Sequence, residues 1–252
     1  MDLTVFDRDK MFFKTDTCPY CSKQFQSIRV KARYFRIIER YPDFGATYEG
    51  NFSPYLYEIS VCPFCGFSWN NDSEEYIMPV HRERLKPMLA SWDGRDLNSG
   101  PRSVDVGIHT SMRGILCDQT RKSKSSSLAK KQLHLAWIYR GLKQVDAEQR
   151  FLVAARDNYR LTLSTEDLWS EQNGSEILAT YLTAVLSHYI GDEQTCVRWL
   201  SRVIFNHPEA YLRPNVVNMA RSLWEDIRHA DWRTSMEEIE TLASEKDEPV
   251  AP

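Results

Sequence analysis

Two short cysteine motifs constrain the fold of this chain more than any other feature of its sequence. Cys18-Pro19-Tyr20-Cys21 and Cys62-Pro63-Phe64-Cys65 share one pattern of cysteine, proline, aromatic residue and cysteine. Two thiolates at this spacing can bind one ion from a tight turn, and two such turns complete a tetrahedral site. Gly66 follows the second motif and permits the positive φ with which a chain leaves such a turn, whereas Ser22 follows the first.

The cellular compartment decides whether paired cysteines act as metal ligands or as disulfides. The first nine residues contain three aspartates and no apolar stretch, so we expect no signal peptide. The most apolar stretch, Ile177 to Ile190, is interrupted by polar residues and is shorter than the ~20 residues of a membrane span. We therefore expect a cytoplasmic protein without membrane association, in which thiols stay reduced.

The motifs favour a single structural Zn²⁺ ion at Cys18, Cys21, Cys62 and Cys65. Iron in a rubredoxin-like site is the alternative, and redox-active disulfides are a third possibility. Forty residues separate Cys21 from Cys62, but closing a loop of about 40 instead of about 17 residues costs only roughly 0.8 kcal/mol. Structural zinc supplies about 10–16 kcal/mol. Four thiolates leave no open coordination position, so the predicted role is structural. The unpaired Cys117 and Cys196 are expected to be buried in helices.

The chain beyond residue 102 has the apolar spacing of amphipathic helices. Polar, glycine- or proline-containing breaks divide it into six segments, for which we expect six helices stacked as antiparallel pairs. Their apolar positions are Val104, Ile108, Met112 and Ile115; Leu128, Leu135, Ile138 and Leu142; Leu152, Ala155, Tyr159 and Leu163; Leu178, Leu182, Val185 and Tyr189; Cys196, Leu200 and Val203; and Val216, Ala220, Leu223 and Ile227.

One stretch of this helical part, Ile177 to Pro208, resembles a tetratricopeptide repeat. The small, glycine, large apolar and proline positions of that motif are occupied by Ala184, Gly191, Cys196, Leu200 and Pro208. The usual aromatic residue is replaced by Ser187, and a weaker copy begins near Lys130. We therefore expect a degenerate tetratricopeptide-like (TPR-like) helical array.

Together these patterns predict an α+β protein with a small N-terminal β-rich zinc ribbon and an all-α TPR-like array. The predicted zinc-ribbon domain covers residues 1–75. A linker with a short helix near His81–Trp92 covers 76–101, and its stretch 93–101 is rich in glycine, proline and aspartate. The helical domain covers 102–235, and an acidic, flexible tail covers 236–252.

A strand between the two cysteine motifs carries basic residues. Arg29, Lys31 and Arg33 alternate with apolar residues, which predicts a half-buried strand with a basic outer face, and the alternation breaks near Tyr34. Such a face could track a phosphate backbone. However, residues 16–66 carry a net charge of only +1, from six Lys/Arg and five Asp/Glu, and the whole chain has a net charge of −3. Nucleic-acid binding is therefore the weaker hypothesis.

Several segments together are similar to a bacterial family, the domain of unknown function 2225. They are Arg40-Tyr41-Pro42-Asp43-Phe44, Tyr48-Glu49-Gly50, Tyr55, Val61–Gly66, Leu135–Arg140 and Asp226-Ile227-Arg228. The resemblance covers roughly residues 10–230. It implies a zinc ribbon followed by TPR-like helices, and it implies no particular activity.

The sequence contains no motif that points to catalysis. The six histidines are scattered, and no phosphate-binding glycine loop or nucleophile motif is present. We therefore expect a non-enzymatic adaptor or scaffold whose helical groove binds a protein or peptide partner. Trp137, Trp169, Trp199 and Trp224 are the candidate anchors of that groove, although most of them are expected in the core. The alternatives are a nucleic-acid-binding regulatory protein and an iron-containing electron carrier.

Overall fold

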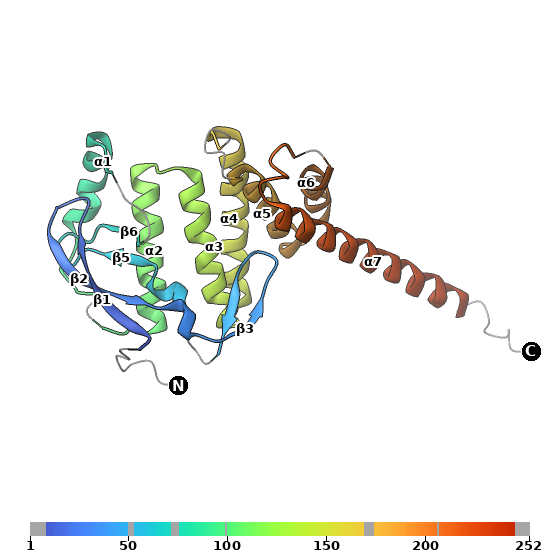
Figure 1. The fold of residues 1–252 in the computed structure, drawn as a ribbon, viewed down its shortest axis with the longest axis horizontal. Coiled ribbons are helices and arrows are strands. Elements are labelled where there is room, and N and C mark those ends of the chain that lie inside the picture. The colour runs from blue at the N-terminus through green and yellow to red at the C-terminus, as the bar shows by residue number, and fades with distance from the viewer. Residues whose placement is uncertain are drawn as a thin grey trace, which may run out of the picture.

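The computed structural model describes residues 9–49, 53–71, 76–98, 100–168, 174–205 and 207–244. Within these ranges, short antiparallel strands form the N-terminal part, and seven α-helices follow (Figure 1). This arrangement confirms the predicted α+β class. Among the described residues, no helix combines the length and the apolar character that a bilayer crossing requires.

In the part of the chain that the structure describes, the strands form three separate two-stranded hairpins. β1 (Met11–Thr17) pairs with β2 (Gln24–Val30), β3 (Ile37–Arg40) with β4 (Ala46–Tyr48), and β5 (Ile59–Val61) with β6 (Ser68–Asn70). Short 3₁₀ helices, Ala32–Tyr34 and Pro54–Tyr57, lie between them. An isolated two-stranded hairpin is marginally stable in water, so these hairpins depend on contacts with the rest of the chain.

Each of the six predicted amphipathic segments forms a helix. They are α2 (Val104–Arg121), α3 (Ser125–Gly141), α4 (Val145–Thr165), α5 (Ser175–Tyr189), α6 (Glu193–Phe205) and α7 (Pro214–Ser244). The Ser103 side chain caps α2 by accepting a hydrogen bond from the Val106 amide. Gly191, with φ of +79°, allows the tight turn between α5 and α6. Consecutive helices pack against one another in chain order from α2 to α7.

Four buried apolar clusters form the core, and two of them join the strands to the helices. One cluster contains Cys18, Cys62, Phe67, Leu85 of α1 (Pro79–Ala90) and Cys117 of α2. Another joins strand residues to Ile115, Leu135 and Ile138 of α2 and α3. The two remaining clusters lie within α3–α5 and α5–α7. The hairpins therefore share their core with the helices, while the predicted domain boundaries stay a prediction.

The segment predicted as part of a linker is firmly anchored. Asn98 is completely buried, and its amide oxygen accepts a hydrogen bond from the Val61 amide at 3.3 Å. The Arg102 guanidinium, also buried, donates to the carbonyl oxygens of Leu56 at 2.7 Å and Ile59 at 2.8 Å and to Asn98 Oδ1 at 2.9 Å. The loop-forming residues predict a connection at this place. They do not indicate that Arg102 would hydrogen-bond this connection to the hairpins.

The last helix, α7, extends away from the rest of the molecule toward the C-terminus (Figure 1). It continues to Ser244, whereas the sequence predicts a flexible tail from Met236 onward. The helix thus covers the first part of that predicted tail. Residues 245–252 lie outside the described residues, so the prediction for them is untested.

Candidate metal centre

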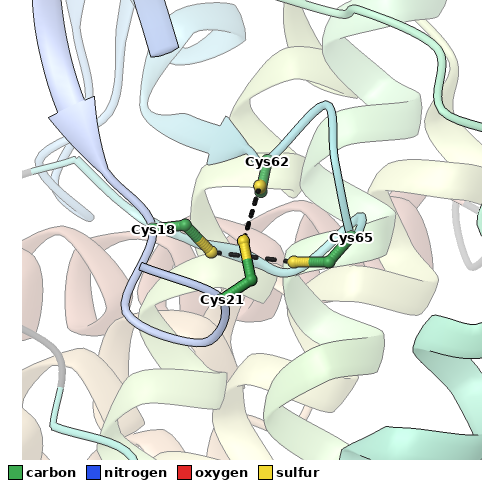
Figure 2. Close-up of side chains that lie close together, drawn as sticks. All are labelled: Cys18, Cys21, Cys62 and Cys65. Carbon is green, nitrogen blue, oxygen red and sulfur yellow. Dashed lines mark hydrogen bonds between the residues drawn. The ribbon is translucent and has the colours of Figure 1, made fainter. Parts of the chain in front are cut away.

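The structure brings together the four cysteines that the sequence indicates. Cys18 and Cys21 lie in the turn between β1 and β2, and Cys62 and Cys65 lie in the turn between β5 and β6. The Sγ atoms of Cys18 and Cys65 are 3.7 Å apart, those of Cys21 and Cys62 are 3.6 Å apart, and all four lie within 4.8 Å of one another. Figure 2 shows the four side chains pointing toward a common centre.

These distances fit a metal ion and not disulfides. With metal–sulfur bonds of 2.3 Å, the sulfurs of a regular tetrahedron lie about 3.8 Å apart, whereas a disulfide needs about 2.0 Å. All four cysteines are free. The cluster is therefore consistent with one tetrahedrally bound ion, whose identity the geometry does not distinguish.

The two cysteine turns have the same backbone geometry. In the first, the Cys18 amide donates to Lys23 O at 3.0 Å, and the Ser22 amide donates to Cys18 O at 2.9 Å. In the second, the Cys62 amide donates to Phe67 O at 2.9 Å, and the Gly66 amide donates to Cys62 O at 2.8 Å. Ser22 and Gly66 occupy equivalent positions with φ of 60° and 70°. Ser22 therefore takes the conformation for which Gly66 is suited.

The four thiols are so close that each ionisation depends on the others. Hydrogen bonds from Cys18 and Cys65 lower the pKa of Cys62, whereas hydrogen bonding to Cys62 raises the pKa of Cys18. Hydrogen bonds with Cys18 and Cys62 also raise the pKa of Cys65. One thiolate is thus favoured, and further ionisation brings like charges together. A divalent cation at the centre would remove that repulsion.

Side chains from outside the hairpins hold both cysteine turns at equivalent places. Arg82 of α1 donates to Pro19 O at 2.9 Å and also to Tyr20 O. Trp92, just after α1, donates from Nε1 to Pro63 O at 2.9 Å. Pro19 and Pro63 are the second residues of their motifs, so their carbonyl oxygens are matched acceptors. The repeated motif indicates that these two carbonyl oxygens are equivalent. The sequence pattern does not indicate that Arg82 and Trp92 are their donors.

The second turn has an additional support from α2. Arg113 Nε donates to Gly66 O at 2.6 Å, and the Arg113 guanidinium lies 4.1 Å from the centre of the Trp92 ring. Burial lowers the pKa of Arg113, and the nearby Cys117 and Cys65 oppose that shift. A positive charge at this place would partly compensate the negative charge of four thiolates around a bound ion.

Replacing Gly66 with alanine should destabilise the protein by about 3 kcal/mol or more. A Cβ atom at this position would lie 2.3 Å from Arg113 Nη2 and 2.5 Å from the Trp92 ring, in addition to the cost of a positive φ. Gly94→Ala is the matched control, because Gly94 also has a positive φ but its nearest neighbour would be 4.0 Å away. Denaturant unfolding should show a loss of only about 1 kcal/mol for Gly94→Ala. Equal losses in the two variants would contradict the close packing of Arg113 and Trp92 around Gly66.

Replacing Ser22 with glycine should stabilise the protein by about 0.5–1 kcal/mol. Ser22 has a φ of 60°, a backbone conformation that is unfavourable for an L-residue but not for glycine. Ser22→Ala is the control, since alanine has the same backbone restriction and should leave stability nearly unchanged. Unfolding midpoints of the three proteins with equal metal content would test this. A glycine variant less stable than the alanine variant would contradict it.

The prediction of an exposed basic face on the strand is wrong for Arg29. The Arg29 side chain is buried, where it pairs with Asp16 and donates to Ser60 Oγ at 3.1 Å. The strand ends at Val30, and the chain turns into a 3₁₀ helix where the alternation breaks. Lys31 and Arg33 therefore do not continue the face of the strand. A buried countercharge on the neighbouring strand is the physical reason, and alternation alone does not reveal it.

The candidate tryptophan anchors have different environments. Trp137 is buried, and its indole Nε1 donates to Asp43 Oδ2 at 2.9 Å. It is therefore packed against Asp43 and is not exposed to a partner in this structure. Trp199 and Trp224 are partly buried against the α5–α7 cluster, and Trp169 lies outside the described residues. Cys117 and Cys196 are fully buried, as predicted.

A second polar site joins the middle hairpin to the helices. We call residues 37–48 the arm and residues 41–45 its tip. The Asp43 carboxylate, completely buried, accepts hydrogen bonds from Arg140 Nη1 at 3.1 Å and Nη2 at 2.8 Å as well as from Trp137. The Tyr181 hydroxyl donates to Pro42 O at 3.0 Å, and the Phe44 ring lies edge-on to the Tyr181 ring at 5.7 Å. The tip thus contacts both α3 and α5.

The Arg140 guanidinium is the centre of this contact. It also bonds Glu148 at 2.7 Å and lies 4.6 Å from the Tyr41 ring centre and 5.0 Å from that of Tyr189. Burial disfavours its charged form, but the hydrogen bonds and negative charges of Asp43 and Glu148 together outweigh burial and raise the pKa of Arg140. We call Trp137, Arg140, Tyr181 and Tyr189 the tip-binding surface.

The fold and the cysteine cluster define a class of α+β proteins in which paired β-hairpin turns form a Cys₄ metal-type site beside a helical array. A family model described as "Uncharacterized protein conserved in bacteria", domain of unknown function 2225, matches residues 11–227. The chain belongs to this family, which confirms the resemblance. Searches of curated proteins and of solved structures gave no match.

Proposed function

We propose that this protein is a non-catalytic adaptor in which a structural zinc ion stabilises the hairpins and the helical array binds a protein or peptide partner. The four cysteine sulfurs would fill the coordination sphere of the ion, so it offers no position to a substrate or an activated water. This closed ligand set supports a structural role for the metal. It also supports assigning no catalytic residues.

The contact between the tip and the helices carries the proposal. Residues of α3 and α5 already bind a turn of polypeptide through one carboxylate, one main-chain carbonyl and one aromatic ring. These are groups that any protein partner can present. A surface with this chemistry is suited to peptide recognition.

The order of the helices supports a TPR-like array as the scaffold of that surface. α3 packs against α4, α4 against α5 and α5 against α6, so two helical hairpins stand next to each other. Repeat arrays of this kind bind partners over a surface built from several repeats. α3 and α5, the first helices of the two hairpins, together form the tip-binding surface.

A photo-crosslinking experiment in cells tests the adaptor role. His188 lies two helical turns after Tyr181 on α5 and is partly exposed. A photo-reactive phenylalanine analogue in place of His188 should yield covalent adducts with one or a few polypeptides. The same analogue in place of Val153, an exposed residue of α4, should not yield those adducts.

The crosslinking result also separates the adaptor from its rivals. Adducts with nucleic acid at His188, or no adducts at any growth condition, would contradict the proposal. Metal analysis addresses the electron-carrier alternative independently. A colourless protein with one zinc per chain supports the proposal, and a red iron protein contradicts its metal assignment.

A further inference from the structure

The arm contacts the rest of the molecule at its tip and also through β4, where Ala46 is buried and the Tyr48 ring lies 6.0 Å from the Tyr55 ring. β3 and β4 hydrogen-bond only with each other among the strands of the described residues, and the pairing is irregular between Ile37 and Glu39. Three of the four residues of β3 are exposed. At the tip, in contrast, Asp43 and Gly45 are buried. A two-stranded hairpin is only marginally stable alone, so the arm resembles a bound peptide that is covalently linked to its binding surface.

The tip-binding surface recognises specific chemical groups. Arg140 donates to both oxygens of the Asp43 carboxylate, and the Trp137 indole adds a third donor. The next residue, Phe44, places its ring against Tyr181. The preceding residue, Pro42, offers its carbonyl oxygen to the Tyr181 hydroxyl. A neutral side chain in place of Asp43 would leave part of this donor set unmatched.

One residue of the tip, Phe44, has an unfavourable backbone conformation. Phe44 has a φ of 67°, although it is an aromatic L-residue. Gly45 leaves no space for a side chain, because a Cβ atom would lie 2.7 Å from the Trp137 ring. Strain of this kind persists where surrounding contacts enforce it, and a competing segment without it can displace the strained one.

We propose that the tip-binding surface is a receptor for a peptide turn that places a carboxylate directly before an aromatic ring, and that the arm covers this receptor until such a segment displaces it. The proposal rests on the proposed adaptor function and names the chemistry of its partner. Because the arm is tethered, it competes at an effective concentration in the millimolar range. A partner therefore binds weakly while the arm is in place and strongly once the arm is released.

A peptide copied from the tip tests this proposal on the full-length, metal-loaded protein. The probe is a fluorescent cyclic peptide with the sequence of residues 39–47, and its binding is measured by anisotropy. Asp43→Asn removes the charge of the tip and leaves the receptor intact. We expect the peptide to bind the Asp43→Asn protein about a hundredfold more tightly than it binds the parent protein.

Two controls accompany the measurement. Glu39→Gln changes another carboxylate of the arm, one that accepts a hydrogen bond from the Tyr41 hydroxyl at 2.8 Å, and should leave peptide affinity at the parent value. A peptide with asparagine in place of its aspartate should bind the Asp43→Asn protein at least about tenfold more weakly than the original peptide. Equal affinity for all three proteins, or for both peptides, would overturn the proposal.

A measurement on the unmodified chain covers the case in which Asp43→Asn does not fold. The Tyr41 amide donates to Gly45 O and the Glu49 amide donates to Arg36 O, both at 2.9 Å, so both report on the arm. Millimolar peptide should accelerate hydrogen exchange at these two amides. Unchanged exchange at saturating peptide would show that the peptide does not displace the arm, which would overturn the proposal.

The adaptor role and this receptor chemistry can fail separately. Aspartate-dependent peptide binding without adducts at His188 would remove the adaptor role and leave the receptor. Adducts at His188 without peptide binding would retain an adaptor and overturn the chemistry proposed for its partner.

Discussion

Replacing Cys62 with serine is expected to abolish stoichiometric metal binding and to lower the free energy of unfolding by roughly 5 kcal/mol or more. The two cysteine turns are joined through their four sulfurs, and each turn connects a two-stranded hairpin that is marginal alone. Loss of one ligand therefore loosens both hairpins together. Metal analysis and chemical denaturation measure the two effects, and hydrogen exchange should locate the loss at β1, β2, β5 and β6.

Cys117→Ala is the matched control for this experiment. Cys117 is fully buried in the same apolar cluster as Cys18 and Cys62, but its sulfur does not belong to the group of four. The variant should keep one metal per chain and lose only the stability expected for a small cavity, about 1 kcal/mol. If the Cys62→Ser protein kept its metal, or if strong chelators left its parent unaffected, the metal centre would be refuted.

Replacing Arg102 with methionine is expected to cost about 3–5 kcal/mol of stability. The Arg102 side chain is 4% exposed and donates to the main-chain oxygens of Leu56, Ile59 and Leu97 and to Asn98 Oδ1. Methionine fills a similar volume but removes the guanidinium donor from all of these buried acceptors. Burial lowers the pKa of Arg102 to about 10, so the arginine remains charged at neutral pH.

Arg95→Met serves as the matched control in the same segment. Arg95 pairs with Asp93, and both side chains are largely exposed. Exposed ion pairs contribute little to stability, so this variant should unfold at the same denaturant concentration as the parent protein. If Arg102→Met also left the unfolding denaturant concentration unchanged, the hydrogen bonds of Arg102 would not stabilise the segment before α2.

The features predicted well from the sequence are those that repeat locally. The helices α2–α7 follow from apolar residues recurring every three or four positions, because each helix buries one face. The grouping of Cys18, Cys21, Cys62 and Cys65 follows from a motif that occurs twice. In both cases the information lies within a short stretch of chain, where it can be read without knowing the tertiary structure.

The features that were missed depend on polar partners far apart in the sequence. Asp43 and Arg140 are 97 positions apart, and the buried Arg29 pairs with Asp16 on the neighbouring strand. Arg102 anchors a segment whose composition is that of a loop. Local patterns describe which residues are apolar, but they do not show which charged groups will meet in the folded chain.

The positions of the arm and its receptor along the chain have a consequence for synthesis on the ribosome. All four cysteines are present once Cys65 has been made, whereas the receptor needs Tyr181 and Tyr189 of α5. A nascent chain can thus bind metal long before the arm has a place to dock. Stalled chains ending after α4 should therefore expose the tip to proteolysis, and chains that extend past α6 should protect it.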